Sequence, residues 1–218
     1  GDAKAKVIAD FFWNSVVSKH TYANGGNSEY EYLAEPGKLS NHLSESTAET
    51  CNTYNMLKLT RHLFTWNPIA SYSDYYERAL YNHILASQNK DDGMMCYFMP
   101  MRMGAKKEFS TPFDAFWCCV GSGLENHVKY GEHIYYQGAD GSLYVNLFIP
   151  SELNWREKKI IVRQQTKFPE SDTVRFSFQM KTSSSFKLRV RKPMWAKGDV
   201  QVLVNKTRAS FQADANGY

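Results

Sequence analysis

The apolar residues of the first 136 positions recur mostly at every third or fourth residue, the spacing that gathers them on one face of an α-helix. The first such stretch covers residues 3–19, and its spaced apolar positions are Ile8, Phe11, Phe12 and Val16. We therefore predict an amphipathic helix at the start of the chain.

A second helix is predicted over residues 46–66. At its start, Ser46 and Glu49 match the capping box, in which a serine and a glutamate satisfy free backbone N–H groups. Pro68 follows and stops the helix. Two further stretches with the helical period cover residues 73–88 and 122–135.

Two segments between these helices lack a regular period. Residues 21–41 are rich in Gly, Asn, Ser and Pro and predict a long loop, which usually lines a site or is disordered. Residues 91–117 predict irregular structure with short extended pieces. The pair Gly25 and Gly26 lacks the preceding strand and following helix of a phosphate-binding loop, so a nucleotide motif is excluded.

From about residue 141 the period changes from 3.6 to 2, which indicates β-strands. The predicted strands are residues 143–149, 159–165, 174–180, 186–190 and 200–204. Short strands at this spacing favour an antiparallel β-sandwich. The sequence therefore predicts an α+β protein with a helical region at residues 1–138 and a β region at residues 139–218.

Composition excludes several classes of protein. The 26 Lys and Arg against 22 Asp and Glu give a net charge of +4 that is spread along the chain, so a nucleic-acid-binding surface is not indicated. No run of about 18 apolar residues occurs, which excludes a membrane-spanning helix. The N-terminal residues lack the pattern of a signal peptide. Aromatic residues reach 15%, as is common both in proteins that bind sugars and in ordinary cores.

The strongest chemical signal is a pair of cysteine motifs. Cys118 and Cys119 are adjacent, and Glu49 and Cys51 form an upstream motif with one residue between them. Three thiolates and one carboxylate fill the tetrahedral shell of Zn²⁺, and a closed shell of this kind is normally structural. A metal explains the clustering better than a disulfide, because adjacent cysteines bridge only through a strained ring.

Simpler interpretations exist for each ligand. The carboxylate of Glu49 could serve the capping box, and Cys51 could be a small buried apolar residue. Residues two apart on a regular helix point about 200° from each other, so Glu49 and Cys51 share an ion only where the helix begins. Outside the motifs, Cys96 and His127 are interpreted as packing residues, and His83 as a core histidine unless its helical face lines a pocket.

At these residues the sequence resembles glycoside hydrolase family 127, the zinc- and cysteine-dependent β-L-arabinofuranosidases. The resemblance is strong over residues 25–136 and loose over the β region. It rests on the segments Gly25-Gly26-Asn27-Ser28, Ala48-Glu49-Thr50-Cys51-Asn52-Thr53-Tyr54-Asn55-Met56, Leu80-Tyr81-Asn82-His83, Tyr97-Phe98-Met99-Pro100 and Phe116-Trp117-Cys118-Cys119-Val120-Gly121.

The resemblance implies a retaining hydrolase that releases β-L-arabinofuranose or a related pentofuranose from a carbohydrate substrate. Cys118 would be the nucleophile, and Glu49, Cys51 and Cys119 would complete its zinc shell. The family's catalytic domain resembles an (α/α)6 barrel of about twelve helices, so this chain would be its C-terminal part followed by a β-sandwich, and could be an inactive fragment. A secreted or periplasmic location is also implied.

The family places its general acid and base, a glutamate, in the loop before Glu49. That loop offers Glu29, Glu31 and Glu35, and Glu31 fits best because it follows the glycine pair and precedes an aromatic residue. Its separation from Glu49 is about two residues longer than in the family pattern. The resemblance further implies that Tyr97 and His83 hydrogen-bond sugar hydroxyls.

Two other functions remain open from the sequence. One is a non-catalytic carbohydrate-binding or scaffold module in which the zinc is structural. The other is a redox role through a disulfide between Cys118 and Cys119.

Overall fold

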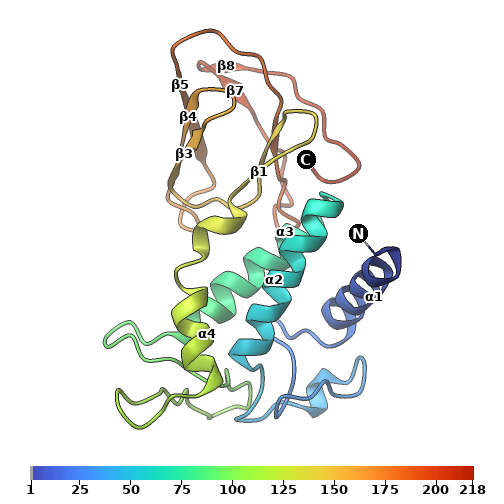
Figure 1. Ribbon diagram of the computed structural model, residues 1–218, viewed down its shortest axis with the longest axis vertical. Coiled ribbons are helices and arrows are strands. Elements are labelled where there is room, and N and C mark those ends of the chain that lie inside the picture. The colour runs from blue at the N-terminus through green and yellow to red at the C-terminus, as the bar shows by residue number, and fades with distance from the viewer. Residues whose placement is uncertain (1) are drawn as a thin grey trace. The chain divides into compact units, whose positions relative to one another are not determined.

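The chain folds into a helical part and a strand-rich part, so it is an α+β protein (Figure 1). A computed structural model describes residues 2–218. Two compact units can be distinguished, Gly1–Tyr130 and Gly131–Tyr218. None of the described helices is both long and apolar enough to cross a membrane.

The first unit is built around α2. Its elements are α1 (Ala3–Lys19), the 3₁₀ helix η1 (Leu39–Asn41), α2 (Thr50–Trp66), α3 (Ala70–Ala79), the π-helical turn η2 (Leu80–Ile84), the 3₁₀ turn η3 (Leu85–Ser87) and α4 (Cys118–Asn126). A last 3₁₀ turn, η4, covers Tyr130–His133. Helix α2 contacts α1, α3 and α4, so it is the element that the other helices of this unit share.

The first helix has the predicted bounds, but of its four predicted apolar positions only Val16 is buried. Ile8 and Phe11 are 66% and 75% exposed, whereas Trp13 and Val16 are buried. The indole N–H of Trp13 donates to the Thr60 hydroxyl of α2 over 2.7 Å, which fixes the side of α1 that faces the unit.

The capping box predicted at Ser46 does not form. Helix α2 begins at Thr50, with Glu49 as the N-cap residue. The Thr47 hydroxyl instead accepts from the Ser44 N–H at 2.8 Å, and Ala48 has φ of +55°, which no helix tolerates at its first turn. The prediction of a helix start at Ser46 was therefore wrong.

The fourth helix lies earlier than predicted, at Cys118–Asn126 and not at residues 122–135. Leu124 and Val128, expected on its buried face, are 62% and 76% exposed. The face that packs carries Cys119 and Gly123, because a β-carbon at Gly123 would meet the Met95 sulfur at 2.7 Å. The packed face of α4 thus consists of small residues and not of large apolar ones.

The second unit contains two three-stranded sheets and a short hairpin. One sheet has the order β1 (Tyr135–Gln137), β2 (Leu143–Val145), β6 (Leu188–Val190), and the other has the order β3 (Ser151–Trp155), β4 (Ile160–Thr166), β5 (Val174–Met180). The hairpin pairs β7 (Leu203–Val204) with β8 (Thr207–Arg208). Strands β2 and β6 run parallel, so the expectation of purely antiparallel pairing was wrong for this pair.

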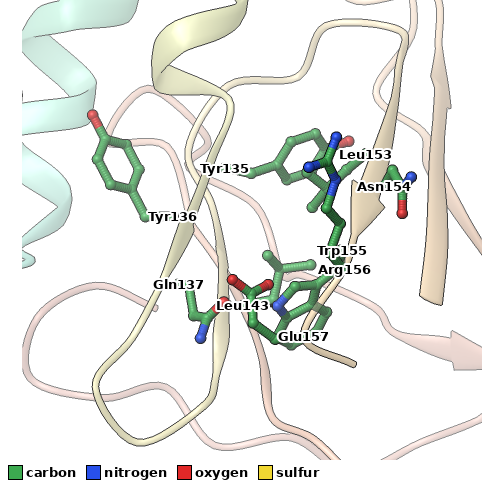
Figure 2. A pocket seen from close by; sticks show the side chains of 9 residues that line it. All are labelled: Tyr135, Tyr136, Gln137, Leu143, Leu153, Asn154, Trp155, Arg156 and Glu157. Atoms are coloured by element: carbon green, nitrogen blue, oxygen red, sulfur yellow. Dashed lines mark hydrogen bonds between the residues drawn. The ribbon is translucent and has the colours of Figure 1, made fainter. Parts of the chain in front are cut away.

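The core of the second unit is formed by side chains from both sheets. Leu143 of β2 packs with Trp155, Ile160 and Val162 of the other sheet, and all four are buried. A pocket of about 240 Å³ lies beside this core (Figure 2). The indole N–H of Trp155 donates to the Gln137 side chain at 2.8 Å, so these two lining side chains are held together.

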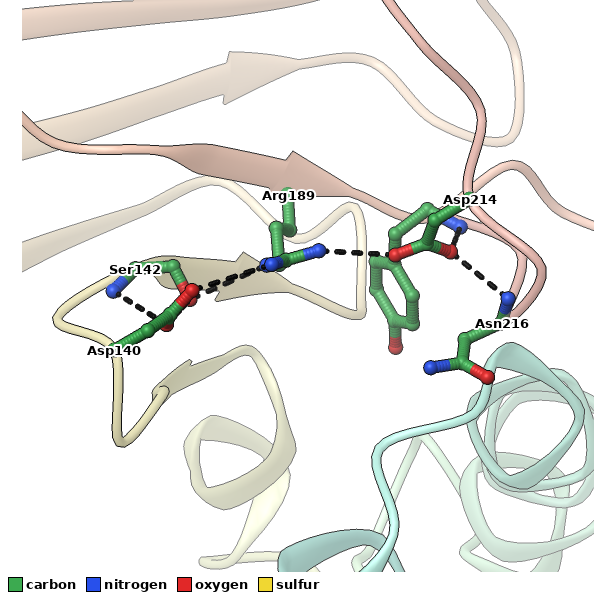
Figure 3. Close-up of polar contacts among 6 residues, drawn as sticks. Asp140, Ser142, Arg189, Asp214 and Asn216 are labelled. Carbon is green, nitrogen blue, oxygen red and sulfur yellow. Dashed lines mark hydrogen bonds and ion pairs between the residues drawn. The ribbon is translucent and has the colours of Figure 1, made fainter.

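An arginine ties β6 to two other segments of the second unit. The Arg189 guanidinium pairs with Asp140 at 3.2 Å and with Asp214 at 2.9 Å (Figure 3). Asp214 also accepts from the backbone N–H groups of Asn216 and Tyr218. The end of the chain is therefore held by charge-assisted hydrogen bonds.

Candidate metal centre and active site

Two pairs of side chains that are far apart in sequence converge at one point of the first unit. One ligand atom from each of Glu49, Cys51, Cys118 and Cys119 lies within 4.8 Å of the others. Two come from the start of α2 and two from the start of α4. This group, called the Cys3Glu cluster below, could hold a metal ion.

The backbone explains how Glu49 and Cys51 reach the same point. Glu49 is extended (φ −63°, ψ 132°), whereas Cys51 already belongs to the first helical turn. The Thr50 N–H donates to the Tyr97 carbonyl at 3.0 Å, which fixes the bend between them. The prediction that this motif lies where the helix starts is confirmed.

Cys118 and Cys119 occupy the first two positions of α4, after the extended residue Trp117. The N-termini of α2 and α4 therefore both contribute to the cluster. Free N–H groups and the helix dipole favour negative charge at such positions, which suits thiolates and a carboxylate.

The distances in the cluster match a tetrahedral shell. The sulfurs of Cys118 and Cys119 lie 3.9 Å apart, and their distances to Glu49 Oε1 are 3.9 and 4.0 Å. Two thiolates on one zinc are separated by about 3.8 Å, since each Zn–S bond is about 2.3 Å. The donor types and their spacing thus fit zinc. In the described part of the chain all four cysteines are free thiols, so Cys118 and Cys119 are not joined by a disulfide.

The protonation of the cluster is strongly perturbed. Burial, followed by the charges of Cys51 and Glu31, raises the pKa of Glu49 to about 7. A hydrogen bond from Cys119, opposed by burial and aided by Ser122, lowers the pKa of Cys51 to about 6. Burial raises the pKa of Cys118, and the hydrogen bond to Cys51 raises that of Cys119. Raised pKa values of this kind mean that the cluster favours bound positive charge, which protons supply here and which a metal cation would supply more strongly.

The sequence-predicted residues Glu31 and Tyr97 meet at the edge of the cluster. The Tyr97 hydroxyl donates to the Glu31 carboxylate. Hydrogen bonds to Cys118, then to Glu31, raise the pKa of the Tyr97 phenol, so the tyrosine keeps its proton between these two groups. Tyr30 and Glu31 have φ of +46° and +70°, and non-glycine residues in this region are strained, as is frequent at functional sites.

The other two candidate glutamates are engaged elsewhere. Glu29 pairs with His42 Nδ1 at 2.7 Å, and Glu35 pairs with Lys38 at 2.9 Å. Of the three carboxylates in the loop, Glu31 is the one whose hydrogen bond leads toward Cys118. Its assignment as the acid and base stays a prediction that this contact supports.

His83 lies in η2 behind the cluster. Its ring is fully buried, and its Nε2 is 3.5 Å from the Thr50 hydroxyl. Burial, with a smaller effect of Lys107, lowers the pKa of His83 to about 4. The neutral ring therefore supports the residue between Glu49 and Cys51, and its contact with a sugar stays a prediction.

Sequence reasoning missed Ser122. Its hydroxyl lies 3.1 Å from Cys51 Sγ and donates to the Cys119 carbonyl at 3.4 Å. The signal was available, because Ser122 follows Cys118 and Cys119 by four and three residues, the spacing of neighbours on a helix. The predicted helix began at residue 122, so Ser122 was not expected on the same helical turn as Cys118 and Cys119.

Two family models together cover most of the chain. The model of the β-L-arabinofuranosidase GH127 catalytic domain matches residues 1–132, and that of the GH127 middle domain matches residues 142–218. No curated protein matches the sequence.

Solved structures have the same fold. A GH127 β-L-arabinofuranosidase from Geobacillus stearothermophilus T6 superposes on 100% of this chain with a TM-score of 0.83 and 23% identity. A GH127 β-arabinofuranosidase covers 94% of the chain with a TM-score of 0.76 and 24% identity, and a further glycoside hydrolase covers 94% with a TM-score of 0.75 and 22% identity. The chain spans 36%, 35% and 38% of these three proteins, respectively. By the match of the catalytic-domain model to more than half of its residues, this chain belongs to the GH127 β-L-arabinofuranosidase family.

Proposed function

We propose that the chain carries the catalytic centre of a retaining glycoside hydrolase that releases β-L-arabinofuranose or a related pentofuranose from a glycan. The observation that carries the proposal is the Cys3Glu cluster, in which one thiol, Cys118, is exposed while Cys119 is buried. An exposed thiol in a group of metal ligands is the member that a substrate can reach.

Glu49, Cys51, Cys118 and Cys119 would hold a zinc ion. The role of zinc in this scheme would be to keep the thiols deprotonated at neutral pH. The thiolate and not the thiol is the nucleophilic form of cysteine. The free N–H groups at the start of α4 favour the same form of Cys118.

The chemistry then follows a two-step displacement. The Cys118 sulfur attacks the anomeric carbon, a C–S bond forms, and the glycosidic C–O bond breaks while Glu31 gives its proton to the leaving oxygen. In the second step Glu31 takes a proton from water, the water oxygen bonds to the same carbon, and the C–S bond breaks. The sugar leaves with its original anomeric configuration, and Cys118 is again a thiolate.

Tyr97 is well suited to position these two groups. Its hydroxyl is hydrogen-bonded to Glu31 and interacts with Cys118, and we propose that it also bonds a sugar hydroxyl. His83 is proposed as a second such residue, although its ring is buried in this chain. We assign Tyr97 the orientation of Glu31 toward the scissile bond.

The helical region, residues 1–138, would be part of an (α/α)6 barrel, and residues 139–218 would form a β-sandwich. Since the matched structures are almost three times longer, the rest of a sugar pocket would come from a portion that this chain does not contain. The isolated chain is therefore proposed to turn over substrate weakly or not at all.

Replacement of the nucleophile tests the mechanism. Cys118→Ala should abolish hydrolysis of an aryl β-L-arabinofuranoside, and Glu31→Ala should slow it by about 10²- to 10⁴-fold. If turnover by the isolated chain is too slow, an electrophilic arabinofuranose analogue should label Cys118, as seen in the mass of the intact protein. Wild-type turnover or labelling in Cys118→Ala would contradict the mechanism.

A second function is favoured by the closed set of four ligands, which is typical of structural zinc. In that case the chain would be a non-catalytic carbohydrate-binding or scaffold module. Bound zinc together with an unlabelled Cys118 would support this function over the first.

A further inference from the structure

A second pocket of the first unit lies at the end of α2 remote from the Cys3Glu cluster. It has a volume of about 500 Å³ and is lined by residues of α1, of the end of α2, of the start of α3 and of the turn between them, among them Lys6, Asp10, Asn14, Trp66, Asn67 and Ser71. Because α2 has 17 residues, its two ends are about 25 Å apart. The pocket is therefore distinct from the metal centre, and its size is that of a small-molecule site.

The pocket offers an aromatic ring to solvent. Trp66, the last residue of α2, is 48% exposed, and the Lys6 ammonium lies 5.9 Å from its ring centroid. Behind it, Trp13 and Tyr72 are buried and pack edge to face with centroids 4.6 Å apart. Trp13 and Tyr72 are thus held in place, and the exposed part of the Trp66 ring, one face of which the Lys6 ammonium approaches, offers a surface for stacking.

The polar groups around this ring suit vicinal hydroxyls. The Asp10 carboxylate accepts one hydrogen bond, from Tyr72 at 3.4 Å, although a carboxylate can accept about four. Asn14 donates one amide hydrogen to the Asp10 carbonyl at 2.8 Å, which holds its side chain at the rim. Asn67 and Ser71 add exposed donors and acceptors.

Charge limits the class of ligand. The charged lining residues are Lys6 and Asp10, one of each sign, so the pocket has no net charge that would select an ion. An exposed ring with neutral donors and acceptors on either side matches a sugar, whose C–H face stacks while its hydroxyls form hydrogen bonds.

The pocket of the second unit lacks these properties. Trp155 there is 3% exposed, and its N–H is already bonded to Gln137. Tyr136 points away from the other lining side chains (Figure 2). That pocket has only about half the volume, and the rings that line it are partly or fully buried.

We propose that the pocket at Trp66 binds a neutral saccharide unit, as a contact for the glycan that is separate from the catalytic centre. The inference rests on the proposed function only for the choice of an arabinose-containing probe. A contact of this kind would hold a long glycan to the protein between successive cleavages.

Nuclear magnetic resonance of the tryptophan side chains tests the proposal directly. Arabino-oligosaccharides are titrated into ¹⁵N-labelled Cys118→Ala protein, and the indole N–H signals of the five tryptophans are followed. The Trp66 signal, identified by its absence in Trp66→Ala, should shift until saturation. Trp66→Ala should weaken binding at least about tenfold, because the stacking surface is lost. As this protein lacks the nucleophile, binding and hydrolysis are tested separately.

Three further variants keep the test decisive. Asn14→Ala changes one exposed side chain at the rim and should weaken binding severalfold even if Trp66→Ala fails to fold. Trp195→Ala removes a tryptophan of the second unit that is 54% exposed and should leave binding unchanged. Lys6→Gln should alter the affinity less than threefold.

The proposal is overturned if wild-type protein does not bind arabino-oligosaccharides. It is equally overturned if Trp66→Ala binds like wild type, or if Trp195→Ala loses as much affinity. Tighter binding of oligogalacturonate that Lys6→Gln abolishes would show an anion site in place of a neutral sugar site.

Discussion

At the scale of single residues, Cys96 differs from the three cysteines of the Cys3Glu cluster. Cys96 and Cys119 are both fully buried, yet burial raises the pKa of Cys96 to about 11 while Cys119 lies within 4.8 Å of three other ligand groups. Burial alone therefore makes a cysteine inert, whereas convergence with other ligands makes it able to bind metal.

This difference predicts metal content. Cys119→Ala should lower the zinc bound per chain, or raise the dissociation constant by at least about 100-fold, because one of four ligands is lost. Cys96→Ala is the matched control, since it removes an equally buried thiol outside the cluster, and should retain full zinc. Metal content is measured by elemental analysis after dialysis. Equal zinc in the two variants would rule out the cluster as the site.

His83 makes stability depend on pH. The folded protein holds its pKa at about 4, below the ordinary value of 6.5, because the ring is buried. Between pH 6.5 and 4 the unfolded chain binds a proton that the folded chain does not, so the free energy of unfolding falls as the pH is lowered through this window. The full effect is on the order of 3 kcal/mol.

His83→Gln should remove much of this pH dependence. Urea unfolding at pH 7 and at pH 4.5 gives the free energy at each pH, and the difference between them should shrink in the variant. The exposed His62 serves as the control, and His62→Gln should retain the wild-type difference. An undiminished difference in His83→Gln would mean that other groups cause the acid sensitivity.

At the scale of elements, the sequence predicted the bounds of one helix and one strand. Helix α1 and strand β5 have their predicted bounds, at residues 3–19 and 174–180. Strand β3 was missed although its burial alternates, because only Leu153 and Trp155 of its five residues are apolar. Strand β1 is separated from the end of the 3₁₀ turn η4 by one residue, and its first residue, Tyr135, is the last residue of the predicted helix 122–135.

The loop before α2 shows a second limit of prediction. Its glycines were seen in the sequence, but their role depends on a distant element. A β-carbon on Gly25 would lie 2.5 Å from the Cα of Ala79 in α3, and Gly25 has φ of +90°. A close approach between two distant segments, such as Gly25 and Ala79, does not produce a repeating pattern in the sequence and cannot be predicted from one.

Gly25→Ala should therefore destabilise the first unit by about 2–4 kcal/mol, from the left-handed backbone and the clash together. Gly37→Ala is the matched control, because Gly37 has a similar φ of +78°, but no described atom lies within 4 Å of the place that its new methyl group would occupy. It should cost only about 1 kcal/mol. Thermal unfolding followed by circular dichroism measures both. Equal losses would mean that the approach to Ala79 is unimportant.

At the scale of the whole molecule, all four ligands of the proposed metal lie in the first unit, and none lies in the second. The sequence located the motifs, and the resemblance identified the family. The convergence of the ligands could not be derived from periodicity, since it depends on how α2 and α4 pack.

This division predicts where zinc acts on the dynamics of the chain. A ligand that binds only the folded state stabilises the segments that form its site, and hydrogen exchange reports such local stability. Zinc added to chelator-treated protein should slow exchange in the first turns of α2 and α4, which supply Glu49, Cys51, Cys118 and Cys119. Sheet β3–β4–β5 provides an internal control and should exchange at the same rate with and without zinc. In Cys119→Ala the protection of α2 and α4 should disappear. Protection spread equally over both units would show that the metal stabilises the chain as one cooperative body, or binds elsewhere.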